Sequence, residues 1–204
     1  MTVMNYSRYL HLKDLLALQN PLTPSEQRDL HDSERLFIVV HQASETLLSQ
    51  ALTDLRHIEA ENCGERCSSY RLDRATHIVH SLVGHVELLH RTLEPEDFLS
   101  FRDRFGTASG LQSAQFHELF RAVDRLTSGD TGHRLGLETL QLLGLSAAVR
   151  QWRYAHLEMV EHMIGTLPGS GDTSGLEYLE RQLNGTPRCE YADGATAGRP
   201  RTHS

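Results

Sequence analysis

The stretch SEQRDLHDSERLFIVVHQASETLLSQALTDLRHIEAENC, residues 25–63, decides the fold, because it contains neither proline nor glycine. A mostly apolar set recurs along it at spacings of three, four or seven, which is the repeat of one face of an α-helix. The set is Leu30, Phe37, His41, Ser44, Leu48, Leu55 and Ile58. Thr23-Pro24-Ser25-Glu26 supplies an N-cap, a proline at the first helical position and a capping-box glutamate. We therefore predict one long amphipathic helix that begins near residue 24.

The remainder of the chain also favours helices. Proline occurs only at positions 21, 24, 95, 168, 187 and 200, so two long runs lack a helix breaker. No run alternates with the period of two that marks a β-strand. The predicted fold class is therefore all-α, a bundle of long antiparallel helices. Apolar spacing, capping residues and glycines predict further helices over about 71–92, from Pro95 to near Gly106, over 112–126, over 136–164 with Gly165 ending it, and over 175–183.

We expect a single domain over residues 1–183. The sequence contains no internal repeat, and its length is enough to bury a core without disulfides or a structural metal. Residues 184–204, NGTPRCEYADGATAGRPRTHS, have almost no apolar content, so burial cannot offset the entropy of ordering them. We predict that they form a disordered tail.

Composition excludes some classes of protein. The 204 residues include 20 basic and 27 acidic ones, a formal net charge of −7 with histidine neutral, and no basic stripe suited to nucleic acid. No stretch of about 18 apolar residues could span a membrane. Cys63, Cys67 and Cys189 are odd in number, and the N-terminus MTVMNYSRYL does not read as a signal peptide. We expect a soluble, cytoplasmic protein with reduced thiols that binds neither nucleic acid nor membranes.

Two histidines, His41 and His156, lie on the apolar faces of their predicted helices. An imidazole in that position needs a compensating partner. It could be a core histidine bonded to a neighbouring carbonyl. It could also be one of a pair lining a haem pocket, because a neutral imidazole in an apolar shell ligates haem iron. Spacing alone leaves both interpretations open.

Arg102 and the cysteines also admit two interpretations each. Arg102 follows Phe98 by four residues, so the ring and the guanidinium share a helix face and could hold an aromatic body and a carboxylate. It could equally be a surface arginine. Cys63 and Cys67 resemble half of a metal site, but no second Cys/His pair stands at a supporting distance, so inert thiols are the simpler interpretation.

Four segments in a fixed order carry a resemblance to one family. HDSERLFIVVHQASE (31–45) resembles the HDE-LFI-HQ-E signature of the tryptophan 2,3-dioxygenase family, which are all-helical haem enzymes. Other segments of that family are similar to YSRYLHLKDLLALQNPLT (6–23), LEPEDFLSFRDRFGTASGLQSAQF (93–116) and HLEMVEHMIGTLPGSGDTSGLEYL (156–179). The chain thus resembles a short, divergent member of the histidine-ligated haem-dependent aromatic oxygenases, with a tryptophan 2,3-dioxygenase-like fold.

The resemblance implies roles for individual residues. His156 would be the proximal ligand of the iron of haem b, with Trp152, Ser109 and Gly110 beside the cofactor. His41 would be the catalytic distal histidine, which accepts a hydrogen bond from the indole N–H of the substrate. The rest of the substrate site that the resemblance implies consists of Phe37 and Phe98 against the ring, Arg102 on the carboxylate, and Ser170, where the family has threonine, on the amino acid group.

The resemblance also implies an assembly. Tyr6, Tyr9 and Leu10 match residues that the family donates to a neighbouring subunit, so residues 1–20 would be exchanged between chains. The expected state is a homo-oligomer, a tetramer built as a dimer of dimers.

This sequence departs from the family pattern in three places. The chain is short, with residues 127–147 trimmed; Ala43-Ser44-Glu45-Thr46 lacks the two aromatics of the family's YELW; and the loop at 169–175 reads GSGDTSG instead of GTGGSSG. These smaller residues could leave room for a substituted tryptophan.

The function predicted is a haem-dependent oxygenase that uses O2 to open the indole C2–C3 bond of L-tryptophan or a substituted tryptophan, giving an N-formylkynurenine-type product. The alternative is a haem-dependent monooxygenase that forms an oxindole or hydroxyindole in a specialised pathway. A non-catalytic haem- or indole-binding module and a ligand-free helical bundle are rivals of a different class. Retention of Phe37, His41, Arg102 and His156 together disfavours the non-catalytic module, and a visible spectrum of the purified protein would decide on the ligand-free bundle.

Overall fold

A computed structural model describes residues 4–60, 64–106, 112–128, 137–168 and 176–184. Within these ranges every regular element is a helix, so the predicted all-α fold class is confirmed. The elements are α1 (Tyr6–Tyr9), α2 (Leu12–Leu15), α3 (Arg28–Glu59), α4 (Glu65–Thr92), α5 (Pro95–Arg102), the 3-10 helix η1 (Asp103–Phe105), α6 (Ala114–Thr127), α8 (Thr139–Ile164) and α9 (Leu176–Asn184).

Two predicted helix starts are wrong. The long helix α3 begins at Arg28 and not near residue 24, because the capping pattern around Pro24 does not form. Instead, the buried Glu34 accepts hydrogen bonds from the backbone N–H groups of Leu22 and Thr23, at 2.8 and 2.7 Å. Residues 22–23 are thereby held against the side of α3. Helix α4 begins at Glu65, six residues before the predicted 71, with Gly64 as its N-cap.

The predicted starts at 112 and 136 lie two and three residues before those of α6 and α8, and the helix from Pro95 ends at Arg102, where η1 continues to Phe105. Pro95 occupies the first turn of α5, Ser113 caps α6, and Gly165 ends α8 with a positive φ of 52° that favours glycine. The loop predicted over 127–134, the glycine-rich loop at 169–175 and the tail from residue 185 lie wholly or mostly outside the described residues. The division into one domain and a tail therefore stays a prediction.

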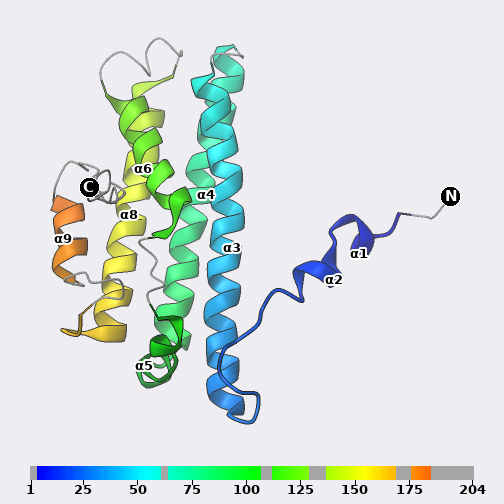
Figure 1. Cartoon of the computed structure of the whole chain (residues 1–204). Helices are drawn as coiled ribbons and strands as arrows, with labels where there is room; N and C mark the ends of the chain where they lie inside the picture. The colour runs from blue at the N-terminus through cyan, green and yellow to red at the C-terminus, as the bar shows by residue number, and fades with distance from the viewer. Residues whose placement is uncertain (1–3, 61–63, 107–111, 129–136, 169–175, 185–204) are drawn as a thin grey trace, which may run out of the picture.

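Four helices form the body of the molecule. Figure 1 shows α3, α4, α6 and α8 running side by side, with α5 at the lower end and α9 beside α8. Helix α4 contacts both α3 and α8, and α6 bridges the same two helices. The core that they enclose is aliphatic along most of its length and includes Leu48, Leu52, Leu72, Leu82, Leu119 and Leu145. At the lower end it becomes aromatic and sulfur-rich, around Phe101, Met159 and Met163.

Residues 4–18 form an arm that leaves this body. The short helices α1 and α2 contact each other and extend away from the bundle (Figure 1). The base of the arm is fixed to α3, because the Gln42 side chain donates to the Leu18 carbonyl at 3.0 Å and accepts from Gln19 at 2.7 Å. The described helices include none that is long and apolar enough to cross a bilayer.

Candidate functional site

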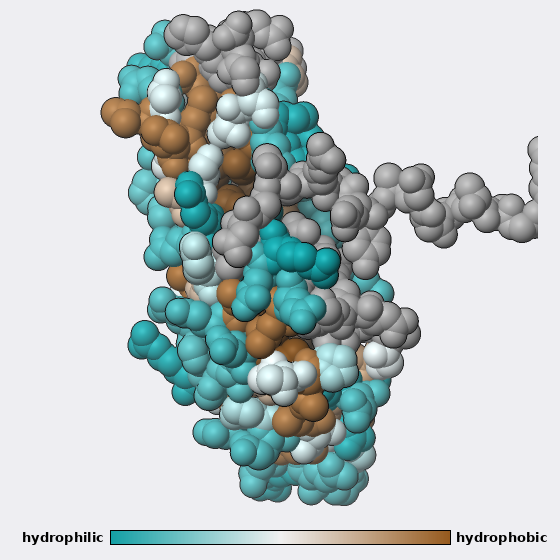
Figure 2. Space-filling model, turned by 90° about the vertical axis from the view of Figure 1, so that its left-hand side faces the viewer, coloured by the Kyte–Doolittle hydropathy of each residue, from teal (hydrophilic) through white to brown (hydrophobic). Residues whose placement is uncertain are grey.

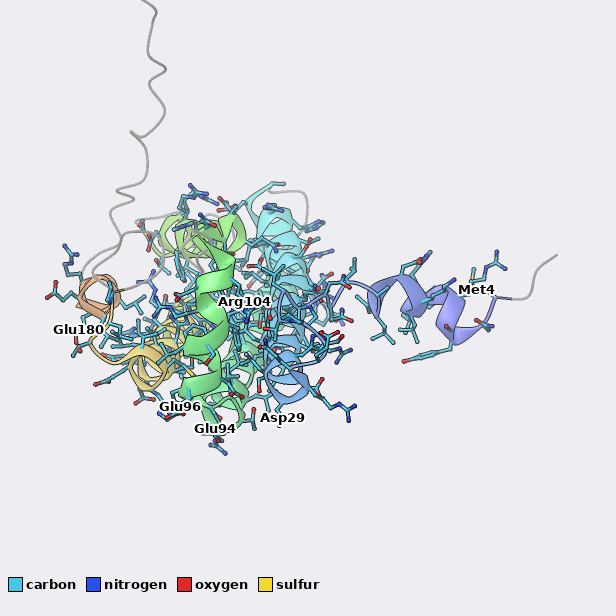
Figure 3. The ribbon with its side chains drawn as sticks, turned by 60° about the horizontal axis from the view of Figure 1, so that its bottom comes forward. Met4, Asp29, Glu94, Glu96, Arg104 and Glu180 are labelled. Atoms are coloured by element: carbon cyan, nitrogen blue, oxygen red, sulfur yellow. The ribbon has the colours of Figure 1, made fainter. Side chains whose placement is uncertain are left out.

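The candidate site lies at the lower end of the bundle, where aromatic side chains from three elements meet. Phe37 on α3 lies 5.7 Å from Phe98 and Phe101 on α5 and 5.4 Å from Phe105 on η1, measured between ring centroids. The rings of Phe98 and Phe101 are nearly perpendicular, as favourable edge-to-face pairs are. Figure 3 looks toward this end of the molecule, with Asp29, Glu94 and Glu96 at its edge. The aromatic cluster thus joins α3, α5 and η1 at this end of the bundle.

His41 projects from α3 beside the Phe37 ring, with the two ring centroids 4.0 Å apart. Its Nδ1 lies 2.8 Å from the carbonyl oxygen of Phe37, one turn back on the same helix. A carbonyl can only accept, so Nδ1 carries the proton and Nε2 keeps its lone pair. Surrounding protein lowers the pKa of His41, although the Phe37 carbonyl and the Glu45 charge oppose that shift. His41 thus presents a neutral imidazole with Nε2 as an acceptor, while its ring retains exposed surface.

His156 projects from α8 and is half-buried. Burial, and then the nearby His41, lower its pKa to about 4, so this imidazole is neutral at neutral pH. Its ring stacks on that of Trp152, with centroids 5.1 Å apart and planes 13° apart. Met159 and Met163, on the same helix, belong to the buried cluster around the site. A neutral imidazole in such an apolar setting has the donor chemistry that haem iron takes from a protein.

Arg102 ties α5 to the segment that follows α8. Its Nη2 donates to the carbonyl of Pro168 at 2.9 Å, and its guanidinium lies 5.9 Å from the Phe98 ring centroid. The side chain is half-buried, so its charge stands near the aromatic cluster and can still meet an anion. The predicted pairing of Arg102 with Phe98 on one helix face is present.

Some predicted site residues are not brought to this end by the structure of one chain. Tyr6 and Tyr9 are 74% and 70% exposed on the arm, and Leu10 is 41% exposed. Ser109, Gly110 and Ser170 lie outside the described residues. The chain's own fold therefore assembles Phe37, His41, Phe98, Arg102, Trp152 and His156, the part of the predicted set that comes from α3, α5 and α8.

The sequence did not single out two polar contacts beside His41. The hydroxyl of Ser44 lies 2.9 Å from Nδ1 of His85 on α4. Glu45 binds Ser113 and Gln115 on α6 through hydrogen bonds of 2.6 Å each. Ser44 and Glu45 follow His41 within about one helical turn, and that spacing was the available signal.

The cysteine motif does not form a described metal centre. Sγ of Cys67 lies 3.7 Å from Nε2 of His57 and 3.4 Å from Nε of Arg71, and Cys63 lies outside the described ranges. Among the residues that the structure describes, no three Cys, His, Asp or Glu side chains are grouped to hold a metal ion.

Comparison with known proteins gives a consistent result. The model of a family described as tryptophan 2,3-dioxygenase matches residues 1–135. The chain is 28% identical to the tryptophan 2,3-dioxygenase of Anaeromyxobacter sp. (strain K), over 88% of this chain and 91% of that protein. It is 28% identical to the enzyme of the same name from Pseudomonas fluorescens, over 88% and 86% of the two chains. A protein of that name from Sorangium cellulosum is 38% identical over 57% of this chain and 29% of its own length.

Proposed function

The chain belongs to the tryptophan 2,3-dioxygenase family and is an oxidoreductase, and from this premise we propose that it uses haem and O2 to open the indole ring of L-tryptophan or a substituted tryptophan. One observation carries the proposal. Two neutral histidines, His41 on α3 and His156 on α8, stand at the same aromatic end of the bundle, close enough for His41 to lower the pKa of His156. The product is of the N-formylkynurenine type.

His156 is the proposed proximal ligand of a b-type haem. Its neutral imidazole, its stacking on Trp152 and the neighbouring buried methionines fit the apolar, donor-poor setting that such a ligand needs. Ser109 and Gly110 are proposed to lie beside the cofactor. When bound, the haem iron supplies the binding and activation of O2, chemistry that no side chain provides.

The protein's own part is to hold the indole. We assign His41 the role of catalytic residue, because its Nε2 lone pair can accept the indole N–H while Nδ1 stays bonded to the Phe37 carbonyl. Phe37 and Phe98 supply aromatic surface for the indole ring. Fixing the ring in one orientation selects which carbon atoms are attacked.

The amino acid end of the substrate needs charged and polar partners. Arg102 is the proposed anchor of the carboxylate, since its guanidinium is half-buried at the aromatic cluster and keeps N–H donors beyond the one that it gives to the Pro168 carbonyl. Ser170 is proposed to bind the ammonium and carboxylate groups.

A second copy of the chain completes the proposed site. The arm exposes Tyr6, Tyr9 and Leu10, side chains too apolar for a free segment in water. We propose that they close the pocket of a neighbouring subunit in a homotetramer, a dimer of dimers. Apolar surface for subunit contacts also remains on the body, where Leu140 and Leu143 of α8 are 77% and 57% exposed, and Figure 2 shows apolar patches on the face seen there.

One observation favours the monooxygenase alternative. After the distal histidine, Ala43-Ser44-Glu45-Thr46 lacks the two bulky aromatics of the family pattern, and the Ser44 hydroxyl binds the Val40 carbonyl and His85. We infer that these smaller side chains leave more room next to His41. A looser site gives the second oxygen atom a route to water, which would leave a one-oxygen product with an intact ring.

Cofactor and substrate titrations test the proposed function. Haem-free protein should take up one haem per chain, and His156→Ala should not bind it stably. Arg102→Ala should bind haem normally but lose about 2–5 kcal/mol of tryptophan affinity, the range for truncating one member of a buried charge pair. Haem stoichiometry and a ferrous spectrum unchanged in His156→Ala would contradict the assignment of the ligand, and normal tryptophan affinity in Arg102→Ala would move the carboxylate site elsewhere.

A further inference from the structure

Glu45, close to His41 on α3, makes several hydrogen bonds to the start of α6. It lies on α3 one turn after that histidine, and it is half-buried. Its Oε1 accepts from the Ser113 hydroxyl at 2.6 Å, and its Oε2 accepts from Nε2 of Gln115 at 2.6 Å. The same amide nitrogen donates to the backbone carbonyl of Glu45 at 3.0 Å. Both protons of the Gln115 amide and both carboxylate oxygens are thus used.

These bonds fix the start of α6. Ser113 is the N-cap of that helix, and its Oγ accepts from the backbone N–H of Phe116 at 3.2 Å. Because the hydroxyl proton is donated to Glu45, the Oγ lone pairs are turned toward the helix N–H groups. Hydrogen bonds to an ionised carboxylate are about twice as strong as neutral ones. Glu45 therefore determines where the first turn of α6 stands against α3.

The same turn of α6 reaches the other histidine. The Phe116 ring stacks on Trp152 with centroids 4.2 Å and planes 21° apart, and Trp152 stacks in turn on His156. A continuous series of contacts, which we call the α6 bridge, runs from Glu45 through Ser113, Gln115, Phe116 and Trp152 to His156. It joins the helix of one histidine to the ring of the other.

The bridge matters because α3 and α8 do not touch through their backbones. Among the described residues, no Cα atom of α3 lies within 8 Å of one on α8, whereas α6 lies that close to both helices. The relative position of His41 and His156 is therefore set by the helices that contact both α3 and α8, which are α4, α5 and α6. Among the ring contacts of the described residues, α6 is the only one of these three helices whose rings contact Trp152, which stacks on His156.

We propose that Glu45 is a positioning residue of this site: by fastening the α6 bridge to α3, it sets the placement of His156 and Trp152 relative to His41. The inference rests on the proposed function for its catalytic consequence, but the bridge itself does not depend on haem. Glu45 does not touch substrate or cofactor. Its charge favours the protonated form of the neighbouring His41, but it acts on Trp152 and His156 only through Ser113, Gln115 and Phe116.

Fluorescence measures the bridge directly, because Trp152 is the single tryptophan of the chain. The variant is Glu45→Ala in the full-length, haem-free protein, with Glu45→Gln as a milder change that keeps the side-chain size. The matched control is Glu59→Ala: Glu59 also joins α3 to α6, through bonds of 2.8 and 3.0 Å to Arg125, but near the C-terminal ends of both helices. All three variants loosen the same helix pair.

In Glu45→Ala, Phe116 should move away from Trp152, so the emission should shift to the red and quenching by acrylamide should rise about twofold, as expected for local opening. Glu45→Gln should lie between this variant and wild type. In Glu59→Ala, the emission and quenching of Trp152 should stay at wild-type values, even if the melting temperature falls as much as it does in Glu45→Ala. Unchanged Trp152 fluorescence in Glu45→Ala, or an equal change in Glu59→Ala, would overturn the proposal.

Kinetics of the haem-loaded enzyme give the second measurement. Displacement of catalytic groups by about 1 Å can cost 100-fold in rate, so kcat of Glu45→Ala should fall about 10- to 100-fold with little change in the KM for tryptophan. Glu59→Ala should keep kcat within about twofold, as expected for a change remote from the chemistry. Failure of wild-type protein to bind haem or turn over tryptophan would refute the proposed function, while the fluorescence result would still decide the role of Glu45. A normal kcat in Glu45→Ala with shifted fluorescence would refute the positioning role alone.

Discussion

His41 and His156 can serve as acceptor and ligand only while they are neutral, and the surrounding protein lowers the pKa of both. For His156 the pKa falls to about 4, from an ordinary value of 6.5. His41 adds to this shift, since two cations at the same aromatic end would repel each other. The bond from His41 Nδ1 to its own helix then selects the tautomer. Backbone and burial thus define both the charge and the direction of these two rings.

This predicts a pH dependence of stability for the haem-free protein. A histidine with a depressed pKa in the folded state takes up a proton on unfolding between that pKa and its ordinary value, so stability falls as the pH is lowered through this window. From pH 7 to 5, His156 should contribute a loss of up to about 2 kcal/mol in the free energy of unfolding. Urea denaturation at both pH values measures it.

The control for that prediction is His156→Gln. It removes the titrating group, so the difference between pH 7 and pH 5 should shrink by the contribution of His156. The pKa values of Glu34, Asp54 and Glu118 are lowered from ordinary values that already lie below pH 5. An identical pH dependence in wild type and variant would show that His156 is not held neutral by the fold.

Sequence alone could identify His41 and His156, because an imidazole on an apolar helix face is conspicuous. The family signature includes Glu45, but the sequence could not identify its role. A glutamate one turn after His41 resembles any solvent-facing residue, and its partners Ser113 and Gln115 are 68 and 70 residues away. The role of Glu45 depends on how α3 and α6 cross, and a local sequence pattern does not predict that crossing.

At the scale of elements, one buried charge cluster joins α3 to α4. Asp54 is fully buried on α3 and accepts hydrogen bonds from Nη1 of Arg71 and Nε of Arg74 on α4, at 2.8 Å each. Burial opposes the charge, but the two guanidinium groups hold the pKa of Asp54 below its ordinary value. The arginine side chains are 24% and 38% exposed, so the carboxylate is the member that depends on its partners.

We predict an asymmetry between the two sides of this cluster. Replacing both arginines, Arg71→Ala with Arg74→Ala, leaves a buried carboxylate unpaired and should cost about 3–5 kcal/mol of stability. Asp54→Ala should cost less, because the released guanidinium groups can turn to solvent. Chemical denaturation measures both values. A larger loss in Asp54→Ala would contradict the view that the carboxylate is the dependent member.

Helix boundaries show where sequence patterns suffice. Pro95 and Gly165 act through their own backbone restrictions, so the start of α5 and the end of α8 were predicted correctly. The motif around Pro24 failed because Glu34, eleven and twelve residues further on, takes the backbone N–H groups of Thr23 and Leu22. A competing partner beyond the local window decides such a boundary.

At the scale of the whole molecule, the exposed arm predicts that each chain contributes residues to the site of a neighbouring chain. Deletion of residues 1–11 removes Tyr6, Tyr9 and Leu10 but leaves the anchor at Gln19 and Gln42. Activity should fall about tenfold or more, because the site loses its cover against water, while haem stays bound. The control Arg8→Ala changes an exposed residue between the two tyrosines and should have little effect.

Mixed oligomers distinguish exchange between chains from a local effect. Chains lacking residues 1–11 keep a complete set of site residues on the body, and His156→Ala chains keep the arm. Co-assembly of these two inactive forms should restore part of the activity. No recovery in verified mixed oligomers, or full activity of an arm-deleted monomer, would contradict exchange of the arm.

The fate of molecular oxygen tests the central claim most directly. Reduced, haem-loaded protein is supplied with L-tryptophan or a ring- or β-substituted analogue under ¹⁸O₂, and the product is identified by mass spectrometry. We predict a ring-opened, N-formylkynurenine-type product that carries two labelled oxygen atoms and whose formation is lost in His156→Ala. An intact indole-derived ring with a single labelled atom, formed only when reductant is added, would contradict the dioxygenase assignment and establish the monooxygenase.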